Sequence, residues 1–257
     1  MGLISLYLFT LLGGLAAGTY AFETCFEKSR TGNRPWVTPL VVVILFALGL
    51  VAAMTHMQNL AHAFASISAG SVNFGSAMVR EVVISACFFI LAIVDLALTA
   101  AKGASVYALR LVTAAVGVIC IVAMGAAYVN VLGNAVWCDA PSTVLTFCAG
   151  DLAMGLALYA ALDGAEYVQS KIRITALVVN VVLAVALCLQ MVVFANCGYS
   201  VALLVVALVV APILSVVLTL LAPKFSGKPT LATVICVLSI VGVAISRYAF
   251  YATCTVL

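Results

Sequence analysis

Long apolar runs, separated by short polar connections, recur along the whole chain. Eight of them approach or exceed the ~20 residues that a helix needs to cross a bilayer. The runs are continuous and do not alternate in short segments, which favours helices over a β-barrel. The pattern predicts an all-α polytopic membrane protein with eight transmembrane helices. They are expected at Ile4–Phe22, Val37–Thr55, Met78–Ala100, Leu109–Asn130, Thr143–Leu162, Ile174–Ala195, Val201–Ala222 and Leu231–Cys254.

Composition agrees with this class, because 67% of the 257 residues are apolar and only 7% are charged. The spans leave no room for a sizeable soluble domain, so residues 1–257 are interpreted as a single eight-helix transmembrane domain. The first span begins almost at Met1 without a basic segment or a clear cleavage site, which indicates a retained helix and not a signal peptide. The net charge of +3 does not indicate nucleic acid, because basic residues in membrane proteins mainly set topology.

The basic residues mark alternate connections between the spans. The second, fourth and sixth connections carry no Lys or Arg, when Arg80 is counted with the third helix. The positive-inside rule therefore places the odd-numbered connections in the cytoplasm and predicts that both termini are extracytoplasmic. Nine of the eleven basic residues lie at these odd-numbered connections: Lys28, Arg30, Arg34, Lys102, Arg110, Lys171, Arg173, Lys224 and Lys228.

Polar residues from three separate stretches are expected at one depth near the outer surface. His56 ends the second span, Arg80 and Glu81 open the third, and Arg247 lies about two-thirds of the way along the eighth. A charge at mid-depth costs about 3 kcal/mol on insertion scales, so such residues predict a functional site. Arg80 and Glu81 point about 100° apart on a helix and need not pair. The alternative for them is an interfacial cap, in which the acid complements the helix dipole and the arginine snorkels outward.

Arg247 has apolar and aromatic neighbours, so we expect an inward-facing partner, with Glu81 as the natural candidate. Tyr251, one turn further on, is expected to offer a ring or a hydroxyl beside a bound aromatic head group. Asp151 has a similar depth in the fifth span, but its participation is the less favoured alternative.

Asp95 lies toward the cytoplasmic end of the third span and is interpreted as a packing or capping residue near Lys102. In the first span, Gly14 and Gly18 form a G-x-x-x-G motif that predicts close helix packing. The connection after His56 has apolar residues at helical spacing, which predicts a short interfacial helix containing Leu60, Phe64 and Ile67, with His62 at the solvent edge.

The positions of the histidines and cysteines argue against a haem or a metal site within the chain. The two histidines, His56 and His62, are six residues apart and cannot face each other across a bundle as a haem pair requires. The nine cysteines are scattered without a C-x-x-C motif. Most are interpreted as small core residues, and a disulfide between Cys138 and Cys197 in the outer loops is the less favoured alternative.

If the chain does chemistry, we expect proton and electron transfer with a lipid-soluble substrate, and a quinol fits this chemistry well. A quinol is a flat amphipathic ring that enters from the bilayer and loses two protons with its two electrons. His56 or Glu81 is expected to accept protons, while Arg247 orients a ring oxygen or tunes that base. Arg80 is an auxiliary charge at the site.

Three segments together resemble the membrane anchor subunit of DMSO-reductase-type molybdoenzymes. They are AAMTHMQNLAHAF at 52–64, VREVVISACFF at 79–89 and SRYAFYA at 246–252. The family's His, Glu and Arg fall on His56, Glu81 and Arg247, and its Phe-Tyr pair falls on Phe250 and Tyr251. The sequence departs from the family pattern in four places: Met57-Gln58 replaces Leu-Gly, no proline follows, His62 stands where an Arg is usual, and Arg80 replaces an Asn.

The resemblance implies a haem-free, metal-free anchor in the bacterial cytoplasmic membrane that binds menaquinol near its outer face. It implies electron transfer to an iron–sulfur subunit, which feeds a molybdopterin catalytic subunit docked on the extracytoplasmic side. Terminal reduction would then take place in these partners.

Three alternatives stay open. The first is a polysulfide-reductase-type quinone-binding anchor, and the second is a purely structural anchor. The third, a small multipass transporter, is disfavoured because such proteins show inverted repeats and helices broken near mid-membrane, whereas only Pro212 lies near the middle of a span here.

Overall fold

The structure is a computed structural model that describes residues 2–26, 34–56, 69–70, 73–129, 131, 133–163, 167, 169–225 and 230–254. Within these ranges the secondary structure is helical and contains no strand. The predicted interfacial helix with Leu60, Phe64 and Ile67 lies outside the described residues, as does His62.

Eight helices of the described chain are long and apolar enough to cross a membrane, which confirms the predicted fold class. Every predicted boundary lies within four residues of the corresponding observed one. The helices are α1 (Gly2–Cys25), α2 (Val37–His56), α4 (Ala77–Lys102), α5 (Tyr107–Val129), the short α6 (Ala135–Cys138), α7 (Ala140–Asp163), α8 (Ser170–Asn196), α9 (Ala202–Leu208), α10 (Leu214–Leu221) and α11 (Thr230–Ala252).

The seventh span is one helix with an irregular middle. A π-helical segment (Val209–Ile213) joins α9 to α10, and a 3₁₀ turn (Ala222–Phe225) ends the span. Pro212 lies in the π segment, because its missing N–H and its ring are incompatible with a regular α-helical turn. The span remains continuous through this bulge.

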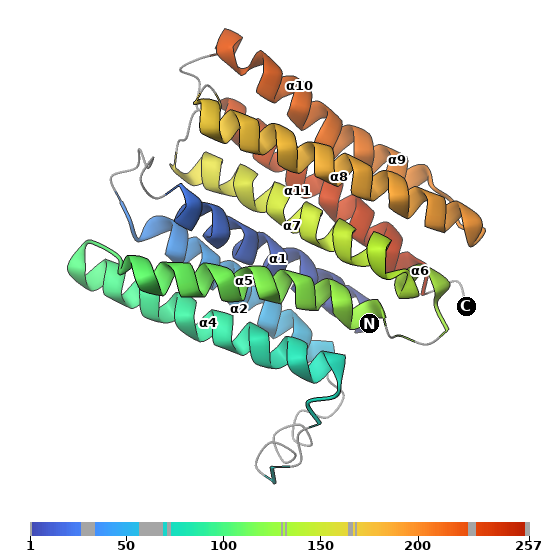
Figure 1. Ribbon diagram of the computed structural model, residues 1–257, viewed down its shortest axis with the longest axis horizontal. Helices are drawn as coiled ribbons and strands as arrows, with labels where there is room; N and C mark the ends of the chain where they lie inside the picture. Colours follow the sequence, from blue (N-terminus) through green and yellow to red (C-terminus); the bar gives the residue numbers. More distant parts are fainter. Residues whose placement is uncertain are drawn as a thin grey trace.

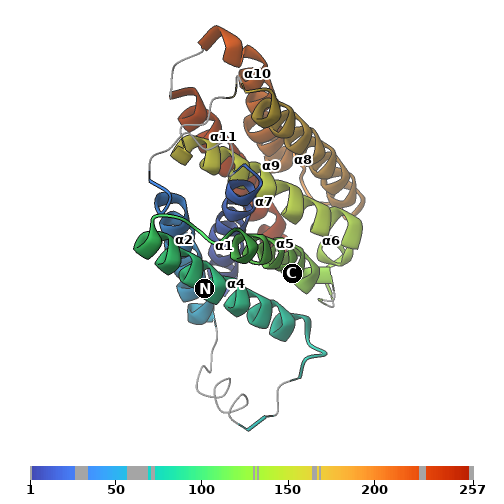
Figure 2. The ribbon, with the colours of Figure 1, turned by 60° about the vertical axis from the view of Figure 1, so that its left-hand side comes forward.

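The central helices are α1 and α7, the two most buried spans of the described chain. Helix α1 packs against α2, α5 and α7, and α4 lies outside α2 and α5 (Figure 1). Helix α7 also packs against α8 and α11, and α9 and α10 complete the other side (Figure 2). Ile44, Leu48 and Val51 of α2 are exposed, as expected for a surface that faces lipid.

Close approach of α1 and α7 depends on glycines. A Cβ atom at Gly18 would overlap the backbone oxygen of Asp151, and one at Gly155 would overlap the backbone of Gly18 and Thr19. The predicted packing role of the G-x-x-x-G motif is therefore confirmed, and its partner is α7.

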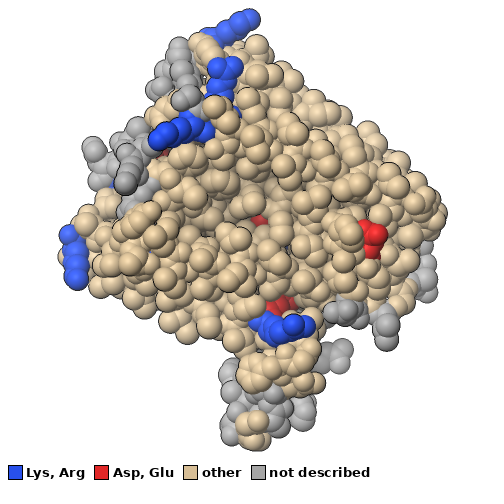
Figure 3. Space-filling model, viewed as in Figure 1, with Lys and Arg blue, Asp and Glu red and all other residues tan. Residues whose placement is uncertain are grey.

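The two ends of the bundle differ in charge. Both termini lie at the right-hand end in Figure 1, where α4 begins. We call this the terminal end; it includes Ser5, Arg80 and Ala252. Lys and Arg side chains gather at the left-hand end in Figure 3. The connections and helix ends on that side carry Arg34, Lys102, Lys171, Arg173 and Lys224, and we call it the basic end.

Candidate functional site

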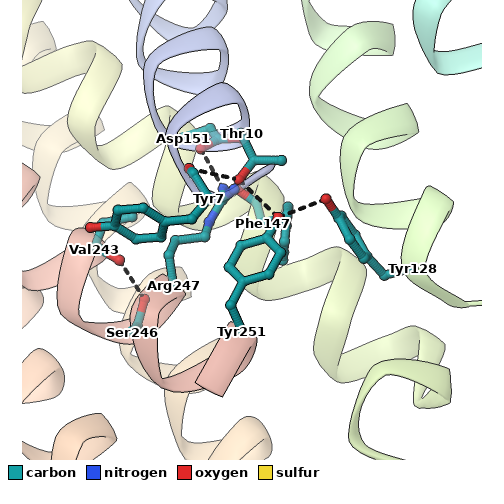
Figure 4. Close-up of polar contacts among 9 residues, drawn as sticks. All are labelled: Tyr7, Thr10, Tyr128, Phe147, Asp151, Val243, Ser246, Arg247 and Tyr251. Carbon is teal, nitrogen blue, oxygen red and sulfur yellow. Dashed lines mark hydrogen bonds and ion pairs between the residues drawn. The ribbon is translucent and has the colours of Figure 1, made fainter. Parts of the chain in front are cut away.

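Arg247 is buried inside the bundle and pairs with a carboxylate. Its Nη2 lies 2.5 Å from Oδ1 of Asp151 on α7 and 3.4 Å from the carbonyl oxygen of Phe147 (Figure 4). The guanidinium carbon also lies 3.7 Å above the centre of the Phe147 ring. The two charged side chains are only 1% and 0% exposed.

The expected inward-facing partner is thus confirmed, but the choice of Glu81 was wrong. Helix α11 packs directly on α7, whereas α4, which carries Glu81, packs mainly on α5 and α2. Asp151 therefore reaches the guanidinium from the neighbouring helix. The alternative in which Asp151 joins the polar group is the correct one.

Three hydroxyl groups form a hydrogen-bonded chain beside this pair. The Tyr251 hydroxyl donates to the Tyr128 hydroxyl at 2.7 Å and is hydrogen-bonded to Oγ1 of Thr10 at 3.0 Å (Figure 4). We call Thr10, Tyr251 and Tyr128 the hydroxyl chain. It joins α1, α11 and α5, and all three side chains are buried. The ring of Tyr7 meets the Tyr251 ring edge-on, with centroids 6.2 Å apart.

Glu81 is buried near the start of α4, and its Oε1 has no hydrogen-bond partner within the described part of the chain. Glu81 and the hydroxyls of Tyr128 and Tyr251 lie close enough to interact electrostatically. The first turn of α4 contains no acidic residue, so Glu81 lies too deep for the helix-cap alternative. The adjacent Arg80 is exposed, as expected for neighbouring helical residues that point in different directions.

Further buried polar atoms at the site have no hydrogen-bond partner among the described residues. They are Nε and Nη1 of Arg247 and Oδ2 of Asp151. Buried polar groups in folded proteins are nearly always hydrogen-bonded, so atoms of this kind mark positions where a ligand or water completes the site. The site therefore offers two hydrogen-bond donors on Arg247 and one carboxylate acceptor on Asp151.

His56 is the last residue of α2, and its side chain lies outside the described part. The preceding residue, Thr55, is hydrogen-bonded to Ser5 of α1 at 2.8 Å. The end of α2 is thereby held at the terminal end of the bundle, about one and a half turns of α1 from Thr10.

The end of α11 is anchored by Trp137 of α6. Its Nε1 donates to the carbonyl oxygen of Phe250 and to Oγ1 of Thr253, both at 3.0 Å. Its ring stacks on Phe250 with centroids 5.2 Å apart. Of the predicted aromatic pair, Phe250 is thus a core residue, and Tyr251 is the one that contributes its hydroxyl to the site.

A second buried group of charges lies near the basic end. Arg110 contacts Glu23 at 3.4 Å and Asp95 at 3.3 Å, and the Tyr20 hydroxyl donates to Asp95 at 2.8 Å. We call these four residues the basic-end cluster. Asp95 therefore has the predicted packing role, but its partner is Arg110, while Lys102 is exposed.

The basic-end cluster and the site are separated by apolar packing. Asp95 and Glu81 are 14 residues apart on α4, or about 21 Å along the helix. Between them Phe88 packs edge-on against Phe46, and a Cβ atom at Gly117 would meet the Phe88 ring. The two clusters are therefore distinct.

All nine cysteines are free, so the disulfide considered for Cys138 and Cys197 is not formed. The Cys138 thiol donates to the carbonyl oxygen of Val131 at 3.0 Å. Among the described residues no three His, Cys, Asp or Glu side chains are grouped so that they could hold a metal ion.

Sequence reasoning missed Tyr128 and Thr10. A tyrosine at the end of an apolar span is typical of the aromatic belt at a membrane surface, so Tyr128 carried no distinct signal. Asp151 did carry one, because an acid within an apolar span needs a buried partner and Arg247 has the same requirement.

Eight membrane-crossing helices with a buried polar site near one end define a multipass helical membrane protein. The chain belongs to the family of DMSO reductase anchor subunits (DmsC), which matches residues 1–253. No curated protein matches the sequence. The family membership makes the chain a membrane anchor subunit of a DMSO-reductase-type enzyme, which associates with catalytic and electron-transfer subunits.

Proposed function

We propose that this anchor binds and oxidises menaquinol at the site formed by Glu81, Arg247 and the hydroxyl chain. One observation carries the proposal: buried polar atoms of two charged residues have no hydrogen-bond partner among the described residues. They are Oε1 of Glu81 and Nε and Nη1 of Arg247. A quinol has two ring hydroxyls that can both donate and accept hydrogen bonds, which matches this set of groups.

Each residue then has a role that follows from its chemistry. The Glu81 carboxylate accepts a proton as the quinol gives up its electrons, and His56 at the end of α2 is a second acceptor. Arg247 and the Tyr251 hydroxyl orient a ring oxygen. Arg80 is exposed at the surface above Glu81 and adds an auxiliary charge.

We also propose that the terminal end faces the extracytoplasmic side of a bacterial cytoplasmic membrane. The gathering of basic residues at the opposite end supports this orientation. The electrons would pass to an iron–sulfur subunit docked over the terminal end and from there to a molybdopterin subunit. This chain would hold no haem or metal of its own.

The decisive experiment compares Glu81→Gln with the wild type in the purified complex. Glutamine keeps the size of the side chain but cannot accept a proton at neutral pH. Quinol-dependent reduction is measured beside reduction driven by an artificial dye that gives electrons directly to the partner subunits. We expect quinol activity to fall at least about a hundredfold while dye activity remains.

Ser85→Ala is the matched control, because Ser85 lies one turn further along the same buried face of α4 and is hydrogen-bonded to Cys120. It should keep both activities. Unchanged quinol activity in Glu81→Gln would contradict the proposal and favour a purely structural anchor.

A further inference from the structure

The Asp151–Arg247 ion pair leaves part of the hydrogen-bonding capacity of Arg247 unused within the described residues. The contact joins Nη2 of Arg247 to Oδ1 of Asp151, and Nε and Nη1 of Arg247 have no hydrogen-bond partner among the described residues. A buried arginine normally uses its five donors in a network. In the basic-end cluster, Arg110 bridges carboxylates from two helices.

The Asp151 carboxyl group occupies space that is open only because Gly14 has no side chain. A Cβ atom at Gly14 of α1 would overlap this carboxyl group, and Gly14 lies one turn from Thr10 of the hydroxyl chain. A glycine on α1, an acid on α7 and an arginine on α11 therefore form one unit. This unit fixes where the guanidinium lies relative to Thr10 and Tyr251.

The guanidinium is held on two further sides by Phe147, through its ring and its carbonyl oxygen. These contacts use the face of the group and Nη2 only. The contacts thus restrain the guanidinium and leave Nε and Nη1 for another partner.

We propose that Asp151 is a positioning residue of the quinol site, which acts by holding the Arg247 guanidinium where its Nε and Nη1 can donate to a quinol oxygen. This inference rests on the proposed function. Asp151 itself does not touch the quinol. Its effect passes entirely through Arg247.

The test is a double-mutant cycle in the purified complex with Asp151→Asn, Arg247→Gln and the double variant. Asparagine keeps the shape of Asp151 and removes its charge. We expect Asp151→Asn to raise the KM for quinol about tenfold, with kcat within about twofold and dye activity unchanged. The double variant should be no worse than Arg247→Gln alone, because Asp151 has no effect once the guanidinium is gone.

Asp95→Asn is the matched control, since it neutralises a buried acid of the other Arg–Asp pair and should leave the KM unchanged. A wild-type KM in Asp151→Asn, or additive effects in the double variant, would overturn the inference. If Asp151→Asn also lost dye activity, the KM of Gly14→Ala for quinol would be measured instead. Its methyl group displaces the Asp151 carboxyl group without changing the charge. A raised KM there supports the inference, and an unchanged KM overturns it.

The outcomes separate this inference from the proposed function. Loss of quinol activity in Glu81→Gln together with a wild-type KM in Asp151→Asn overturns only the positioning role. Full quinol activity in Glu81→Gln overturns the proposed function, and the positioning role with it.

Discussion

At the scale of single residues, the Tyr251 hydroxyl holds the site together because it is hydrogen-bonded to two other helices. Tyr251→Phe keeps the ring and its packing but breaks both hydrogen bonds. We expect a loss of about 1–3 kcal/mol in the free energy of unfolding and a clear fall in quinol activity with dye activity retained. Thermal unfolding and the two activity assays measure these effects.

Tyr20→Phe is the control for this substitution, because it removes a buried phenol that donates to Asp95 at the other end of the bundle. A similar stability loss without any change in quinol activity is expected. Equal losses of quinol activity in both variants would show that the effect of Tyr251→Phe is structural.

We expect Arg110 to stabilise the folded bundle and to take no part in quinol oxidation. It contacts Glu23 and Asp95 in a dry environment, so Arg110→Met removes the cation that these two carboxylates share. Breaking a buried ion pair by removing one partner costs about 3–5 kcal/mol, and we expect a strong fall in the unfolding temperature. Quinol and dye activities should fall in parallel, because the loss is one of assembled complex. Selective loss of quinol activity would contradict this role.

The sequence predicted residue identities better than residue pairings. Glu81 and Arg247 could be selected because a charge in an apolar span is costly, and both are buried in the structure. Their pairing could not be predicted, because Asp151 and Glu81 have similar depths and only the packing of α7 on α11 decides between them. Arg110 was assigned to a connection, yet it is 1% exposed inside the first turns of α5.

At the scale of helices, the eight spans were predictable because apolar runs of sufficient length have no other stable environment than the bilayer. The neighbours of each span were less predictable. The G-x-x-x-G motif indicated that α1 approaches another helix closely, but the partner glycine, Gly155, is more than 130 residues away in the sequence. The contact needs a glycine on each of two helices, and only the folded structure shows that these two helices are neighbours.

Because of this contact, we expect alanine substitutions at two glycines of α1 to differ in their effect on stability. Gly18→Ala places a methyl group against the backbone of α7, which cannot move locally, so we expect a stability loss of about 1–3 kcal/mol. Gly13→Ala places its methyl group against the end of the Met124 side chain, which can adopt another rotamer. The unfolding temperatures of the two variants, measured side by side in detergent, test this. Equal losses would mean that backbone contact is not what makes Gly18 necessary.

At the scale of the whole molecule, the difference in charge between the two ends bears on which end faces which side of the membrane. The site lies near the terminal end, and an apolar layer around Phe88 separates it from the basic-end cluster. A proton accepted at Glu81 is therefore closer to the terminal surface than to the basic end. The orientation of the bundle then determines on which side of the membrane quinol oxidation releases its protons.

The orientation can be measured with single-cysteine variants in which the other native cysteines are replaced. Cys197 is exposed between α8 and α9 at the terminal end, and Lys102→Cys introduces a thiol at the basic end. If the positive-inside rule applies, a membrane-impermeant maleimide should label Cys197 in right-side-out vesicles and Lys102→Cys only in inverted vesicles. Labelling of both after solubilisation in detergent is the control for reactivity. The reverse pattern would place the site on the cytoplasmic side, and the partner subunits would then have to dock there to receive electrons from Glu81 and its neighbours.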